Sequence, residues 1–171
     1  MEAPATSRHL AALEQMLGLE RQLLETLQFK LTQAKLVLTA NESRFVAPAL
    51  REVQAAMEDI RTAEDERMKA TAAIAADWGV HSKSLTLAYL ADHAPEPYGA
   101  RFRDHRYAFM DLTSEIERLS ADNQRLATAN LDVIKGTLDL LYDVTEQSDT
   151  YDAKGHRSDA ARGPLRLDRS L

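Results

Sequence analysis

The chain has 171 residues, 28% of them charged, with a net charge of −6 and no cysteine. Its 27 Ala and 24 Leu outnumber its six Val and four Ile by about five to one. Because Ala and Leu cost little in a helix and strands favour β-branched residues, this composition predicts an all-α fold and excludes a sheet protein. The missing cysteines exclude disulfides, Cys-ligated zinc and a thiol nucleophile.

The N-terminal segment carries no targeting signal that we recognise. Charged residues such as Glu14 and Glu20 interrupt its apolar positions, and no window approaches the roughly 18 apolar residues that span a bilayer. We therefore expect a cytoplasmic protein with no stable membrane insertion. The two signs of charge are mixed along every predicted helix, which argues against a nucleic-acid partner.

A first long helix is predicted over residues 7–40. Its apolar residues recur in steps of three and four, as in a coiled-coil seam, and Glu20 interrupts the series once. The seam residues are Leu10, Leu13, Leu17, Leu24, Leu27, Leu31, Ala34 and Leu38.

A second helix is predicted over residues 48–78, after a break at 41–47. Pro48 suits the first turn of a helix, and Gly79 is a good C-terminal cap. In the middle of this helix, Glu64 and Arg67 occupy positions where the seam should be apolar. Either the seam shifts to Ala63 and Met68, or this stretch is less buried.

The pattern breaks between residues 79 and 103. Ser82 is a candidate cap for a short helix containing Leu85, Ala88 and Tyr89, and the prolines and glycine of HAPEPYG predict a loop. A third long helix follows over about 102–146. Its stripe is Phe109, Leu112, Ile116, Leu119, Leu126, Val133, Leu140 and Val144.

These elements predict an elongated antiparallel bundle of three long helices, coiled-coil-like, with a short connecting helix. Helical periodicity ends near Gln147, and the residues beyond it cannot bury enough apolar surface to offset their ordering entropy. We expect a helical domain at 1–147 and a disordered C-terminal tail at 148–171.

No pattern in the sequence predicts catalysis. The five histidines are dispersed, and none of the nucleotide-binding, hydrolase or metalloprotease motifs occurs. His105 lies in phase with the third-helix stripe, where a core or boundary histidine is the simpler interpretation. We expect no enzyme activity, no cofactor and no metal.

The most informative feature is apolar surface in the second half of the third helix. Beside the stripe that includes Leu126 runs a second one, formed by Leu131, Ile134, Leu138 and Leu141. Either both stripes are buried inside the bundle, or one awaits an amphipathic partner helix. Asn123, Asn130 and Thr137 lie in phase with the first stripe, where a buried Asn fixes register at a cost in stability.

The tail contains the element TYDAKG, with Tyr151 as a candidate anchor of a short linear motif and Gly155 as the residue that turns the chain. A chance occurrence of one aromatic residue is the alternative.

Four segments together resemble the FlgN family of flagellar export chaperones, which serve the hook-associated (hook–filament junction) proteins. They are ESRFVAPALREV, AADWG, LSADNQRLATANLDVIKGTLDLL and TYDAKG. The resemblance implies a small bacterial cytosolic protein without catalytic activity. It would bind C-terminal helical regions of its clients, prevent their premature assembly and deliver them to the export gate.

The resemblance also implies where partners bind. The client surface maps to the third helix around Leu131, Ile134, Leu138 and Leu141, with Leu126 beside it. Tyr151 and Gly155 correspond to a family element that docks on the cytoplasmic domain of the export gate. Two alternatives stay open: a structural coiled coil that self-associates without a client, and a chaperone for another flagellar or virulence substrate. A homodimer is compatible with either role.

Overall fold

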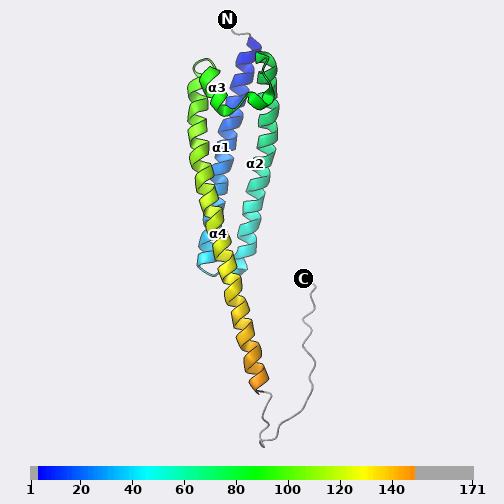
Figure 1. Ribbon diagram of the computed structural model, residues 1–171, viewed down its shortest axis with the longest axis vertical. Helices are drawn as coiled ribbons and strands as arrows, with labels where there is room; N and C mark the ends of the chain where they lie inside the picture. The colour runs from blue at the N-terminus through cyan, green and yellow to red at the C-terminus, as the bar shows by residue number, and fades with distance from the viewer. Residues whose placement is uncertain (1–3, 149–171) are drawn as a thin grey trace, which may run out of the picture. The chain divides into compact units, whose positions relative to one another are not determined.

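The structure, a computed structural model, describes the backbone of residues 4–148 and the side chains of residues 5–139. Helices are the only regular secondary structure in this part of the chain (Figure 1), which confirms the predicted all-α class. Its elements are α1 (Pro4–Thr39), α2 (Ser43–Trp78), the 3-10 helix η1 (Ser82–Ser84), α3 (Leu87–His93) and α4 (Tyr98–Ser148).

The chain divides into two units, Met1–Thr128 and Ala129–Leu171, with the division inside α4. Unit 1 therefore contains α1 to α3 and the first part of α4, and the described part of unit 2 is the remainder of α4. Residues 149–171 lie outside the described residues, so the predicted tail at 148–171 and the domain boundary before it stay predictions.

The seam of α1 is buried as its spacing predicts. Seven of its eight apolar residues are buried, and Leu24 is half-buried. The helix ends in a tight turn in which Asn41 has a positive φ of 53°. There the amides of Asn41 and Glu42 donate to the carbonyls of Leu38 and Val37, both at 3.2 Å. These bonds satisfy carbonyls at the end of α1 and let α2 begin two residues later.

The predicted start of α2 is wrong by five residues, because Pro48 lies inside the helix rather than in its first turn. A proline inside a helix removes one backbone hydrogen bond, to the carbonyl four residues earlier. Pro48 is the sixth residue of α2, so the lost bond lies in the first turns of the helix and the rest of α2 is unaffected. The buried residues Ala56 and Ile60 hold the helix against α1 further along. At its other end, Gly79 adopts a φ of 64° and caps α2 as predicted.

Two apolar clusters hold unit 1 together. The first joins the start of α1 to the end of α2, to α3 and to Phe102 at the start of α4. The second joins Leu31 of α1, Ile60 of α2 and Leu119 of α4. Figure 1 accordingly shows α1 and α2 side by side, with α3 at the end of the pair where the chain begins. The first part of α4 thus packs against both α1 and α2.

The connection between α2 and α4 differs from its predicted form. Instead of one helix capped by Ser82, the chain forms η1 and then α3. The N-terminal cap of α3 is Thr86, whose hydroxyl oxygen accepts a hydrogen bond from the Tyr89 amide at 3.1 Å. The helix α4 begins at Tyr98, within the predicted loop. Only glycine fits at position 99, because a Cβ there would lie 2.9 Å from the Ala94 carbonyl oxygen.

Candidate functional site

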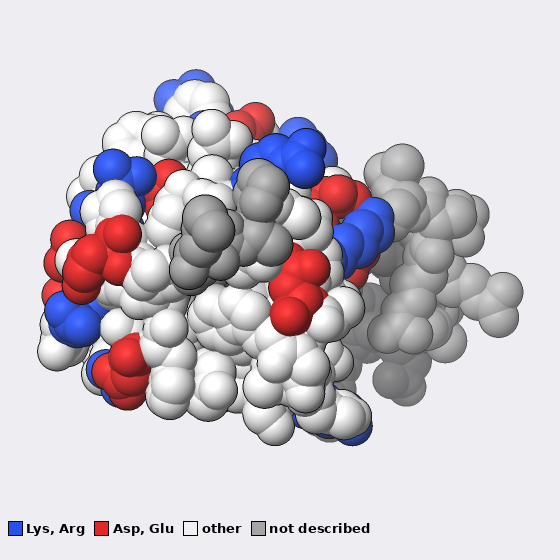
Figure 2. All heavy atoms as spheres, turned by 90° about the horizontal axis from the view of Figure 1, so that it is seen from above, with Lys and Arg blue, Asp and Glu red and all other residues white. Residues whose placement is uncertain are grey.

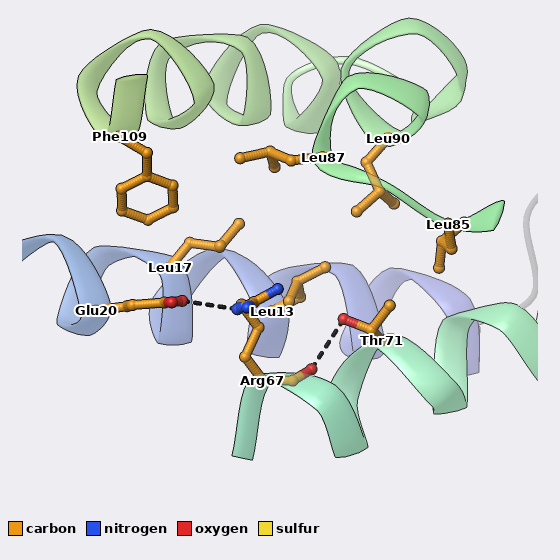
Figure 3. A pocket seen from close by; sticks show the side chains of 9 residues that line it. All are labelled: Leu13, Leu17, Glu20, Arg67, Thr71, Leu85, Leu87, Leu90 and Phe109. Atoms are coloured by element: carbon orange, nitrogen blue, oxygen red, sulfur yellow. Dashed lines mark hydrogen bonds and ion pairs between the residues drawn. The ribbon is translucent and has the colours of Figure 1, made fainter. Parts of the chain in front are cut away.

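The polar residues that interrupt the two seams meet each other inside unit 1 (Figure 3). The Glu20 side chain is 9% exposed, and its Oε2 lies 2.8 Å from Nε of Arg67, whose side chain is 37% exposed. Among residues 61–70 of α2 only Ala63 is buried and Met68 is exposed, so this stretch is less buried, as the second alternative predicts. At Arg67 the stretch is joined to α1 by the ion pair with Glu20, which neither seam alone predicts.

A cavity of about 190 Å³ adjoins this pair, lined mostly by leucines of α1, α3 and the preceding loop. Burial raises the pKa of the Glu20 carboxyl, Arg67 opposes that rise, and nearby Glu64 adds to it. Because Glu20 and Arg67 face each other rather than an open site, we assign the pair a structural role. Among the described residues no group of three or more metal-ligating side chains occurs.

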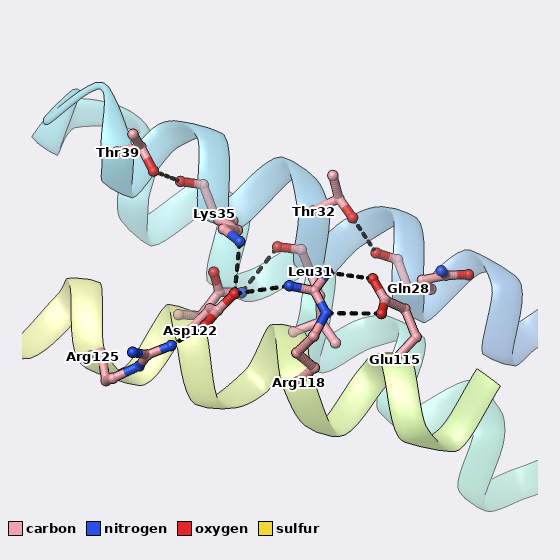
Figure 4. Close-up of polar contacts among 10 residues, drawn as sticks. Gln28, Leu31, Thr32, Lys35, Thr39, Glu115, Arg118, Asp122 and Arg125 are labelled. Carbon is pink, nitrogen blue, oxygen red and sulfur yellow. Dashed lines mark hydrogen bonds and ion pairs between the residues drawn. The ribbon is translucent and has the colours of Figure 1, made fainter. Parts of the chain in front are cut away.

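A second polar cluster joins α1 to α4 (Figure 4). Nζ of Lys35 lies 2.7 Å from Oδ2 of Asp122, and Arg118 and Arg125 also pair with that carboxylate. Hydrogen bonds from Lys35 and Arg125 lower the pKa of Asp122. Next to it, the buried Asn123 donates from Nδ2 to the Leu31 carbonyl oxygen at 2.9 Å. This bond fixes the position of α4 along α1.

The predicted interaction residues on α4 fall in two groups. Leu126, in unit 1, is half-buried. In unit 2, Leu131, Ile134 and Leu138 expose 67%, 51% and 48% of their surface, and Val133 of the other stripe exposes 64%. The alternative that both stripes are buried in the bundle is wrong for these four residues. The side chain of Leu141, and all of Tyr151 and Gly155, lie outside the described part of the chain.

The α1–α2 pair also exposes apolar side chains. Two of them, Leu50 and Met57, are in phase with Ile60 in the sequence, which predicts that they belong to the apolar seam of α2, and this is wrong for both. Phe29 and Leu36 lie seven residues apart on α1, and Leu50 and Met57 lie seven apart on α2; each is at least 43% exposed. Their seven-residue spacing was the available signal. The exposed set on α4 is denser, with four large apolar residues within eight positions, so we take it as the candidate functional surface.

Charge does not single out another surface on the face that Figure 2 shows. Lys and Arg side chains alternate there with Asp and Glu, and uncharged residues lie between them. None of the described helices is long and apolar enough to span a membrane.

Comparison with known proteins identifies the family of the chain. No curated protein and no solved structure matches the chain. The model of one protein family, described as FlgN protein, matches residues 1–159. That match covers all of the described helices and extends past Tyr151 and Gly155. The chain therefore belongs to the FlgN family, whose members are flagellar export chaperones.

Proposed function

We propose that this protein binds the C-terminal helical regions of hook-associated proteins in the bacterial cytoplasm, prevents their premature assembly and delivers them to the flagellar export gate. The observation that carries the proposal is the exposed apolar surface of α4 at Leu131, Ile134 and Leu138. Family membership supports an export chaperone role. In this proposal the three long helices form an antiparallel bundle, and residues 148–171 remain outside it.

The chemistry of this surface suits reversible binding. Full burial of a Leu or Ile side chain contributes about 1.5–3 kcal/mol, and these side chains, about half exposed, have only part of that left to gain. The association must also offset lost translational and rotational freedom. An apolar contact of this kind, without a covalent or metal bond, dissociates readily when the client is handed over.

Binding of the C-terminal region of the hook-associated protein from the same genome tests the proposal by calorimetry or pull-down. We expect Ile134→Gln with Leu138→Gln to abolish binding, because both anchors lose their apolar surface. The control is Asp132→Gln with Asp139→Gln, which places the same residue on the opposite side of α4. Glutamine resembles leucine in helix propensity, so helix content stays similar. Binding that survives in the first variant would remove this surface from consideration.

We also propose that the tail element around Tyr151 and Gly155 docks on the cytoplasmic domain of the export gate. Tyr151→Ala should leave client binding intact and reduce secretion of the client into the culture medium. Tyr151→Phe keeps the aromatic ring and should retain more secretion. Loss of client binding in Tyr151→Ala would contradict this division of roles between helix and tail.

A homo-oligomeric scaffold without a client is the competing function. Light scattering separates the two, because a scaffold gives an oligomer whose size is independent of concentration, with the α4 surface covered by a second copy.

A further inference from the structure

The exposed apolar surface of unit 2 is wider than one helix covers. At 100° per residue, Val133 and Leu131 lie about 160° apart around the axis of α4. Ile134 and Leu138 lie between them on the same arc, and Asp132, Lys135 and Asp139 fill the rest of the circumference. An amphipathic helix that packs against one neighbour presents an apolar stripe of about 100°.

A polar line divides this arc into two stripes. Asn130 and Thr137 lie along it, seven residues apart and in phase with the buried Asn123. We call the side with Val133 the seam stripe, since Val133 is in register with Leu119 and Leu126 of unit 1. The side with Leu131, Ile134 and Leu138 is the outer stripe. A single helix placed on either stripe leaves the other in water.

Over the last two heptads of unit 1, no large apolar residue occupies the positions in register with the outer stripe. Those positions are Glu117, Ser120 and Gln124, which are all exposed, and Ala127, which is half-buried. There the seam stripe alone packs, with Leu119 in one cluster with Leu31 of α1 and Ile60 of α2. Beyond residue 128 the sequence keeps the apolar seam position at Val133 and adds a second apolar stripe.

We infer that the client docks on α4 as a pair of helices, one on each stripe, rather than as a lone amphipathic helix. This inference rests on the proposed function. Its precedent is the seam stripe of unit 1, which also packs against a pair of helices, α1 and α2. The same heptad register continues into unit 2, so the seam stripe there can make the same kind of helix contact with the client. The outer stripe adds the apolar area against which the second helix of the client packs.

The test compares two segments of the hook-associated protein from the same genome, its last helix alone and its last two helices, each titrated against the full chain. We expect the two-helix segment to bind at least about tenfold more tightly, because the second helix buries apolar side chains that the first leaves exposed. Equal affinities would overturn the inference.

Three variants locate the contacts. Val133→Gln and Leu138→Gln should each weaken the two-helix segment at least about tenfold, whereas Asp139→Gln, on the third side of the helix, should change its affinity less than about twofold. The last helix alone should respond to only one of the first two. All three residues are exposed, so circular dichroism should show unchanged folding.

The outcomes also separate this inference from the proposed function. If Leu138→Gln weakens binding and Val133→Gln does not, the client binds as a single helix and only the inference fails. If neither segment binds the wild-type chain, or a second copy covers the surface in a stable dimer, both fail.

Discussion

Replacing Arg67 by leucine leaves the carboxyl of Glu20 inside unit 1 without its cation. Removing one partner of a fully buried ion pair costs about 3–5 kcal/mol. Here the Arg67 side chain is 37% exposed, so water reaches one side of the pair and the cost is lower. We expect Arg67→Leu to reduce the free energy of unfolding by about 2–3 kcal/mol at pH 7, or the melting temperature by about 5–10 °C.

The reciprocal change should be tolerated. In Glu20→Leu the guanidinium of Arg67 turns toward solvent, and an apolar side chain joins Leu13, Leu17 and Phe109 around the cavity. Replacing buried charge by apolar volume is often neutral or stabilising. We expect a stability within about 1 kcal/mol of the wild type, or above it.

The two variants should also differ in their dependence on pH. Because burial raises the pKa of Glu20, the folded state holds its proton more firmly than the unfolded state. The free energy of unfolding therefore decreases as the pH rises from the ordinary pKa of a glutamate to the raised pKa of Glu20 in the folded state. Above that pKa, Glu20 makes the free energy of unfolding no more dependent on pH. The slope should extend to higher pH in Arg67→Leu and disappear in Glu20→Leu.

Urea unfolding followed by circular dichroism, at several pH values, measures both effects. Glu20→Gln serves as a control that removes the charge and keeps the shape of the side chain. Equal destabilisation by Arg67→Leu and Glu20→Leu at pH 7 would refute the reasoning, since it would mean that the cost lies in lost packing and not in an uncompensated carboxylate.

Two further predictions concern unit 1 in the same assay. Asn123→Leu should raise the free energy of unfolding by about 1 kcal/mol, because Oδ1 of this buried amide has no hydrogen-bond partner. A decrease would show that the hydrogen bond from Asn123 to Leu31 stabilises the fold by more than the burial of the amide destabilises it. Gly79→Ala should lower the free energy of unfolding by about 1 kcal/mol, because alanine disfavours the φ of 64° at this position. Nothing lies within 4 Å of the added Cβ, so a steric clash does not add to this cost. Gly136→Ala, also in open space but in a helix, is the matched control and should increase helix content.

The helices were largely predictable because their seams are dense. Eight apolar residues in steps of three and four locate α1 to within three residues at each end. The starts of α2 and α4 were missed because Pro48 and Gly99 are tolerated inside helices here. Proline affects only the first turns of α2, and Gly99 is required by its contact with the Ala94 carbonyl.

The pairing of Glu20 with Arg67 was not predictable from either helix alone. Each residue was recognisable as a polar interruption of its own seam. Which residues of α1 and α2 face each other depends on the length of the turn between them, and the tight turn at Asn41 replaces the longer break that Pro48 suggested.

The candidate surface was predictable in position but not in exposure. Periodicity places Leu131, Ile134 and Leu138 on one side of a helix. It does not tell how much of each side chain is exposed, and in the structure Leu131, Ile134 and Leu138 are all exposed.

The short turn at Asn41 has a consequence for the order of folding. The pair α1–α2 closes through a loop of a few residues, so its entropic cost of closure is small and it forms quickly. The bond from Asn123 to Leu31 joins residues 92 positions apart and forms only after α4 has been synthesised. During translation, Leu31 and Ile60 therefore lack their packing partner Leu119 until α4 has been synthesised. In that interval the nascent α1–α2 pair is the species most prone to aggregate.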